Sequence, residues 1–162
     1  MVLEGYIYWI TENIAGGPIP YDERDYEYLR SIGVQTVVSL VESWEYEAYS
    51  RLSERQVTEL LRKLGIMLVR CPTMDGHAPD EDSLLKLAML LDENDRRGIR
   101  TYVHCVGGMG RTPTVLAAFL VYRGYSTEDA FRIVSEANPD ISITDEQYYA
   151  VKALELLLRQ RR

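Results

Sequence analysis

The sequence predicts an α/β fold in which a mixed, largely parallel sheet of about five strands lies between layers of helices. Short aromatic and β-branched runs alternate with longer segments whose apolar residues recur at helical spacing. The run over 34–41 is almost continuously apolar, which is typical of a central strand covered on both faces. With 162 residues, 46% of them hydrophobic, the chain is long enough for one sizeable core and too short for two ordinary domains. We therefore expect a single-domain three-layer sandwich over 1–162.

The expected elements alternate along the chain. Strands are expected over 6–10, 13–15, 34–41, 66–69 and 99–103. Helices are expected over 22–32, from Ser50 or Ser53 to 64, over 80–97, after Thr112, over 126–137 and from 144 to the terminal arginines. Gly33, Gly65 and Gly98 end three of these helices, because glycine accepts the left-handed conformation that closes a helix. The run 16–18 breaks the second strand, and 42–45 is expected to be a loop.

Composition limits the class of protein. A net charge of −7 and a pI near 4.9 disfavour nucleic acid and acidic membranes as partners. No apolar run approaches a membrane span and the first residues lack the order of a signal peptide, so we expect a cytoplasmic protein. Two cysteines and two histidines without helical spacing indicate no disulfide framework, no metal and no cofactor. Arginine supplies 15 of the 18 basic residues, which favours a heat-adapted source.

The stretch from His104 to Thr112 reads His-Cys-Val-Gly-Gly-Met-Gly-Arg-Thr and joins the last expected strand to a helix. Its three glycines allow a tight turn whose N–H groups point inward, and the positive end of the helix faces the same hollow. Such a hollow suits a tetrahedral dianion and stabilises a thiolate at Cys105, while Arg111 adds a two-pronged donor for phosphate oxygens. A cysteine beside a turn that only joins strand to helix would not need the arginine.

Cys-x5-Arg, followed by Thr112 and preceded by His104, resembles the signature of the cysteine-dependent protein phosphatases. The length and layout resemble their small dual-specificity type, found in archaea. The resemblance implies that Cys105 is the nucleophile, that Thr112 donates to its sulfur and that Gln147 places the hydrolytic water. It implies phosphate binding by Val106, Gly107, Gly108, Met109, Gly110 and Arg111. Local alternatives exist, because Thr112 can cap the helix and Thr144 with Gln147 forms a capping box.

The leaving oxygen of a phosphoester needs a proton, and the signature stretch has no group free to supply it. In the family, an aspartate in the loop after the preceding strand plays this part, and Asp75 lies at the matching place. Asp80 is the rival, but its position before Glu81 and Asp82 is that of a helix N-cap. We therefore predict that Asp75 is the general acid.

Four further side chains have both a functional and a structural interpretation. The segment 42–45 is expected at the rim of the cleft, where Trp44 either stacks on a phosphoaryl ring or packs on its own domain. His77 either contacts substrate or the acid, or bonds locally. Cys71 either traps an oxidised Cys105 as a disulfide or fills the strand end. We expect His104 to orient the loop rather than donate a proton.

The functional hypothesis is metal-independent hydrolysis of phosphomonoesters on proteins, phosphotyrosine first and then phosphoserine or phosphothreonine, through a phosphocysteine. Family members that act on inositol lipids carry lysines in the signature loop, whereas 106–109 are neutral here. We expect a monomer that binds phosphorylated proteins or peptides, and phosphate or other oxyanions. Two alternatives are a phosphate- or phosphopeptide-binding module without turnover and a sulfur-transferring cysteine protein.

Overall fold

The computed structural model describes residues 3–161, so Met1, Val2 and Arg162 lie outside the described part. The sheet consists of β1 (Tyr8–Trp9), β2 (Ile14–Gly17), β3 (Val34–Ser39), β4 (Met67–Arg70) and β5 (Arg100–His104). The spatial order is β1-β2-β5-β3-β4, and only β1 runs antiparallel to its neighbour. The expected mixed, largely parallel sheet of five strands is thus confirmed.

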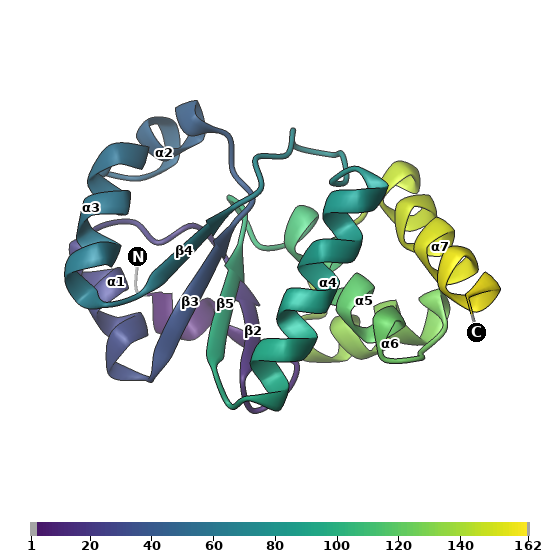
Figure 1. The fold of residues 1–162 in the computed structure, drawn as a ribbon. Coiled ribbons are helices and arrows are strands. Elements are labelled where there is room, and N and C mark those ends of the chain that lie inside the picture. Colours follow the sequence, from purple (N-terminus) through teal and green to yellow (C-terminus); the bar gives the residue numbers. More distant parts are fainter. Residues whose placement is uncertain (1–2, 162) are drawn as a thin grey trace.

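Helices cover both faces of the sheet (Figure 1). They are α1 (Glu23–Ser31), α2 (Ser43–Tyr49), α3 (Glu54–Leu64), α4 (Glu81–Arg96), α5 (Arg111–Tyr122), α6 (Thr127–Ala137) and α7 (Asp145–Gln160), and a 3-10 turn covers Leu3–Tyr6. In Figure 1, α1 to α3 lie on one side of the sheet and α4 to α7 on the other. This arrangement confirms the three layers.

Successive residues of the central strands point to opposite faces. Val37 of β3 and Tyr102 of β5 belong to the core beneath α1 to α3, whereas Val38 and Val103 belong to the core beneath α4 to α7. Both positions of each pair are fully buried. This explains why these strands are apolar throughout rather than alternating.

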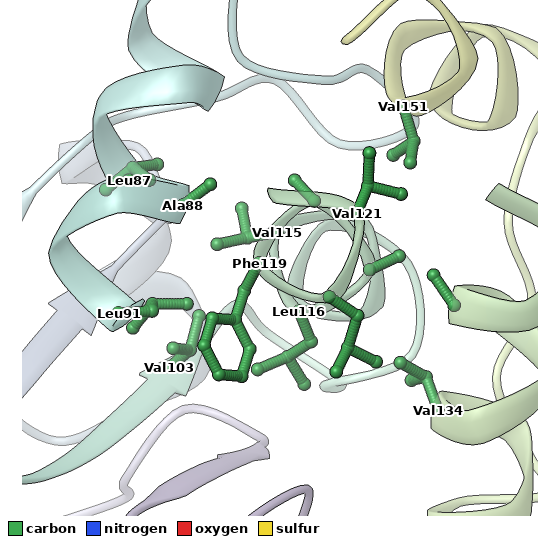
Figure 2. Packing of buried hydrophobic residues seen from close by; sticks show 14 of the residues in the cluster. Leu87, Ala88, Leu91, Val103, Val115, Leu116, Phe119, Val121, Val134 and Val151 are labelled. Atoms are coloured by element: carbon green, nitrogen blue, oxygen red, sulfur yellow. The ribbon is translucent and has the colours of Figure 1, made fainter. Parts of the chain in front are cut away.

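Helix α5 is the centre of the larger core (Figure 2). From Arg111 to Val121 every residue of this helix is buried. Figure 2 shows Phe119 and Val115 directed toward α4 and β5, and Val121 directed toward Val151 of α7. Leu116 faces β2, since a Cβ on Gly16 would lie 2.8 Å from its Cδ1. Because the helix is enclosed on all sides, its first turn, which carries Arg111 and Thr112, is held in a fixed position relative to the sheet.

The structure corrects two expectations. The segment expected as a loop at 42–45 begins helix α2, because Glu42 accepts from the backbone of Glu45 while the Glu45 carboxylate accepts from the Glu42 N–H at 2.8 Å. The second strand does not break at Gly16 and Gly17 but continues through both. A Cβ on Gly16 would lie 2.7 Å from Thr112 Cγ2, and one on Gly17 would lie 2.5 Å from the Tyr102 hydroxyl. The strand therefore requires glycine for close packing rather than for a turn.

The carboxyl ends of the four parallel strands meet at one edge. Gly17 pairs with His104, His104 pairs with Ser39, and Ser39 pairs with Arg70. The segments that follow β3, β4 and β5 therefore leave the sheet side by side, at the upper edge in Figure 1. Within residues 3–161, none of the helices combines the length and apolar character that spanning a membrane requires.

Candidate active site

The turn after β5 surrounds the sulfur of Cys105. The side chain is only 3% exposed, and the Gly108 N–H donates to Sγ at 3.2 Å. Gly108 has a φ of +74°, and a Cβ there would lie 2.5 Å from the carbonyl carbon of Gly17. Tyr8 donates from its hydroxyl to the Gly108 carbonyl at 2.7 Å. The turn is thus packed against β2 and pinned from β1, with an N–H group aimed at the sulfur, as the sequence predicts.

Arg111 is held in place by the carboxylate of Glu45, a residue that we expected from the sequence only at the rim of the cleft. Its two terminal nitrogens donate to the two oxygens of Glu45 at 2.7 and 2.9 Å, and one also donates to the Thr73 carbonyl. Both side chains are almost fully buried, at 2% and 3% exposure. Nε of Arg111 is buried with no hydrogen-bond partner among residues 3–161. Glu45 therefore fixes the guanidinium plane and leaves Nε available to an oxyanion.

The ion pair keeps both groups charged inside the protein. Burial alone would raise the pKa of Glu45, but hydrogen bonds from Arg111 and from the Glu42 backbone outweigh it and lower that pKa. Burial likewise opposes the charge on Arg111, and Glu45 with Cys105 raises the pKa of the guanidinium. The arginine is therefore a fixed positive charge beside the sulfur.

Asp75 lies at the mouth of this site. Its carboxylate is 3.8 Å from Arg111 Nε and its side chain is 86% exposed. Asp80, the rival, accepts from the backbone of Ser83 at 2.8 Å and from its hydroxyl, as an N-cap of α4. The expected contrast between a carboxylate near the signature turn and a capping carboxylate is thus observed.

The loop that carries Asp75 is bonded to the first turn of α7. Thr144 donates from its hydroxyl to the Gly76 carbonyl at 2.8 Å. Gln147 donates from Nε2 to the His77 carbonyl at 3.0 Å, and His77 Nδ1 lies 2.7 Å from a carboxylate oxygen of Glu146. His77 thus bonds locally, and three contacts hold the loop beside the signature turn.

Gln147 forms the expected capping box, and its amide also lies beside the signature turn. Its amide oxygen accepts from the Thr144 N–H at 3.0 Å and its own N–H donates to the Thr144 hydroxyl, which confirms the capping box. The same amide faces the signature turn, since a Cβ on Gly110 would lie 3.5 Å from Nε2. Only one hydrogen of Nε2 is used by the His77 carbonyl, so one is left for another acceptor.

Thr112 does not cap α5. Gly110 occupies the N-cap position without a side-chain bond, and Thr114 is the residue whose hydroxyl donates to the Gly110 carbonyl, at 2.8 Å. The Thr112 hydroxyl is fully buried and has no partner within the described chain. A hydroxyl in this state is free to donate to a group that the site binds or generates.

His104 is a buried, neutral histidine. Desolvation lowers its pKa from 6.5 to about 4, and the nearby Arg70 and Arg111 act in the same direction. Nδ1 lies 3.0 Å from the Cys105 carbonyl, so this nitrogen carries the hydrogen. The ring stacks on Tyr102, with 6.0 Å between centroids. The expectation that His104 orients the loop is met by this bond.

Two other side chains lie outside the site. Trp44 is on the surface of α2, where its indole N–H donates to Glu42 at 2.7 Å and its ring lies 6.2 Å from that of Tyr49. Cys71 is half-buried after β4, and burial raises the pKa of its thiol. Among residues 3–161 there is no group of three or more potential metal ligands.

A buried cysteine sulfur, an N–H group aimed at it, an anchored arginine and an adjacent carboxylate form a site whose geometry suits phosphoester hydrolysis. Comparison with known proteins agrees. Residues 17–125 match the family described as "Polymorphic toxin system, DSP-PTPase phosphatase" (Tc-R-P). The crystal structure of Tk-PTP in its active form superposes with a TM-score of 0.82 and 30% identity, covering 93% of this chain and 97% of that one. The chain therefore belongs to the dual-specificity family of cysteine-dependent phosphatases.

Curated relatives match over part of their length. Phosphatidylglycerophosphate phosphatase PTPMT1 of Arabidopsis thaliana is 27% identical over 153 residues, 92% of this chain and 43% of the relative. Cyclin-dependent kinase inhibitor 3 of Sus scrofa is 31% identical over 100 residues, 62% of this chain and 46% of the relative. The chain thus spans a little under half the length of these two relatives. The kinase associated phosphatase structure, at 22% identity and a TM-score of 0.86, shares the fold.

Proposed function

We propose that this protein hydrolyses phosphomonoesters on protein side chains, phosphotyrosine first, through a phosphocysteine at Cys105. The observation that carries the proposal is the anchored Arg111. Its guanidinium is fixed by Glu45 with Nε left open, and Asp75 lies 3.8 Å from that nitrogen. A sulfur-transferring protein would need no such acid, and a binding module would need no nucleophile.

In the first step, the Cys105 thiolate attacks phosphorus, so that an S–P bond forms while the P–O bond to the substrate breaks. Asp75 gives its proton to the leaving oxygen. Backbone N–H groups of 106–111 and Nε of Arg111 bind the three free oxygens, and most of the acceleration comes from this fixed complementary charge. Replacing the planar, anchored donor by an ammonium in Arg111→Lys removes both its geometry and its bond to Glu45.

In the second step, water attacks phosphorus and the S–P bond breaks, which returns the thiolate and releases phosphate. The ionised Asp75 takes the proton from water. We assign the placing of this water to the second hydrogen of Gln147 Nε2, because the amide faces Gly110 and has a hydrogen to spare. The buried hydroxyl of Thr112 is assigned to the departing sulfur, since it has no partner in residues 3–161. Neither step uses a metal.

The preference for a protein substrate rests on charge. Val106, Gly107, Gly108 and Met109 bring no positive charge to the site, and the chain carries a net −7. A phosphoinositide or another polyanionic headgroup would meet one buried arginine and no lysine in this turn. The names of PTPMT1 relatives make phosphatidylglycerophosphate a second candidate, and it serves as the comparison substrate.

We further infer that 1–162 forms one catalytic domain that acts as a monomer in the reducing cytoplasm of a heat-adapted, archaeal-type cell. The thiol nucleophile requires a reducing compartment, and the 15 arginines among 18 basic residues support heat adaptation. Light scattering and a melting temperature above about 80 °C would support these points. A dimer or a mesophilic melting temperature would contradict them.

Hydrolysis of p-nitrophenyl phosphate in EDTA tests the chemistry. Wild type should turn over, Cys105→Ser should be inactive, and Asp75→Asn should lose roughly a hundredfold or more. Rapid acid quench should trap phosphorus on Cys105, detected by mass spectrometry. Retention of phosphopeptide without turnover would favour the binding module, and undiminished hydrolysis by Cys105→Ser would refute the mechanism.

A further inference from the structure

A pocket of about 540 Å³ adjoins the signature turn, which contributes part of its lining. Its walls come from the N-terminal segment, the turn itself and the segment that follows α6. The residues that matter are Tyr6, Ile7, Pro18, Val106, Met109 and Asp140. Tyr6 and Met109 are substantially exposed, so the pocket is open to an incoming group.

The walls are mostly apolar and the charge at the pocket is negative. Among residues 3–161, Asp140 is the only charged residue that lines the pocket, and its carboxylate makes no ion pair there. Ala137, the last residue of α6, also lines the pocket, so the negative end of an 11-residue helix faces the same space. An apolar channel with a negative end suits a side chain with a long aliphatic stem and a cationic head.

The pocket lies within reach of a residue that flanks the phosphorylated one. Gly107 lines the pocket and is two residues from Cys105, so their Cα atoms are at most about 7 Å apart. Ser142 donates its N–H to the Met109 carbonyl at 2.8 Å, which fixes the segment carrying Asp140 against the turn. Adjacent residues of a peptide have Cα atoms about 3.8 Å apart, so the side chain next to a phosphotyrosine can enter a pocket that adjoins the phosphate-binding turn.

We propose that this pocket is a specificity subsite that binds an arginine or lysine next to the phosphotyrosine of the substrate. The stem lies along Tyr6, Val106 and Met109, and the cationic head lies at Asp140. The inference rests on the proposed function for its substrate class. It adds a determinant that the phosphate site does not contain, because Asp140 lies outside the phosphate-binding turn.

Binding to the inactive Cys105→Ser protein tests the subsite without turnover. Fluorescein-labelled phosphotyrosine peptides carry arginine, norleucine or glutamate on one side of the phosphotyrosine, in one set before it and in another after it. In one of the two sets, the arginine peptide should bind about three- to fivefold more tightly than the norleucine peptide, which is the range of an exposed ion pair. The glutamate peptide should bind most weakly. Asp140→Asn should abolish the advantage of arginine over norleucine. Glu27→Gln, which removes an exposed carboxylate from α1, should leave it unchanged.

Three outcomes overturn the proposal. Arginine and norleucine peptides bind equally in both sets, or Asp140→Asn keeps the preference, or Glu27→Gln removes it as well. A different occupant is revealed if wild type prefers dioleoyl over dihexanoyl phosphatidylglycerophosphate in micelles, Tyr6→Ala loses that preference, and arginine gives no advantage. Failure of the proposed function is separate, since it appears as absent hydrolysis of p-nitrophenyl phosphate by wild type.

Discussion

Glu45 is the residue whose removal most directly tests how the site is built. Glu45→Gln keeps the shape of the side chain but removes its charge, and one amide N–H then faces the guanidinium. The change weakens two charge-assisted hydrogen bonds of 2.7 and 2.9 Å in a pair that is almost fully buried. A charge-assisted bond contributes about 1.5–3 kcal/mol, and the amide oxygen retains one neutral acceptor. We therefore expect a loss of about 3 kcal/mol in the free energy of unfolding, at the lower end for breaking a buried pair.

Urea denaturation followed by circular dichroism measures this loss. With a slope near 2 kcal/mol per M, the midpoint should fall by about 1.5 M. The kcat/KM for p-nitrophenyl phosphate should fall about a hundredfold, because a shift on the order of 1 Å in the Arg111 guanidinium misplaces its N–H groups relative to the phosphate. The matched control is Glu47→Gln, which removes an exposed carboxylate from the same helix. A midpoint within 0.5 M of wild type (about 1 kcal/mol), together with an unchanged kcat/KM, would show that Glu45 does not anchor the arginine.

Three further predictions concern stability and the acid loop. Because the pKa of His104 is about 4 when folded and 6.5 when unfolded, only the unfolded chain takes up its proton between these values. The free energy of unfolding should therefore fall by roughly 3 kcal/mol as the pH drops from 6.5 to 4, and His104→Asn should remove this part of the fall. If the urea midpoints of wild type and His104→Asn depend equally on pH, the prediction is wrong. Glu146→Gln loosens the loop at His77 and should slow the hydrolysis of phenyl phosphate up to about fivefold. Hydrolysis of p-nitrophenyl phosphate should slow less, because its better leaving group needs less help from an acid. Equal effects on both substrates would argue against the contact. Gly17→Ala forces a Cβ against Tyr102 and should cost about 1–3 kcal/mol by urea denaturation, whereas wild-type stability would show that the strand has room for it.

Much of the site is visible in the sequence because its parts are contiguous. Cys105, the glycines and Arg111 lie within seven residues, so local chain geometry brings them together wherever a strand precedes and a helix follows. Asp75 is separated from them by 30 residues. Its position near the turn could still be predicted, since the alternation of strands and helices places the loop after β4 at the same edge of the sheet.

The missed features depend on contacts between distant segments. Glu45 looks like any acidic residue in a polar tetrad, and only the convergence of the ends of β3 and β5 brings it to Arg111. The capping pattern of Glu42 and Glu45 directly after a strand was the available signal for α2. Gly16 and Gly17 read as strand breakers because the side chains that require them, from Thr112 and Tyr102, lie on other elements.

By itself, the sequence determined the chemical groups, the α/β class and the edge of the sheet at which the groups gather, because periodicity and local spacing are properties of neighbouring residues. The tertiary structure decided which carboxylate anchors Arg111, which helix holds the loop of Asp75, and that the Thr112 hydroxyl has no partner among residues 3–161. Such choices follow from the packing of segments far apart in the chain, where distances of an ångström decide whether a bond exists.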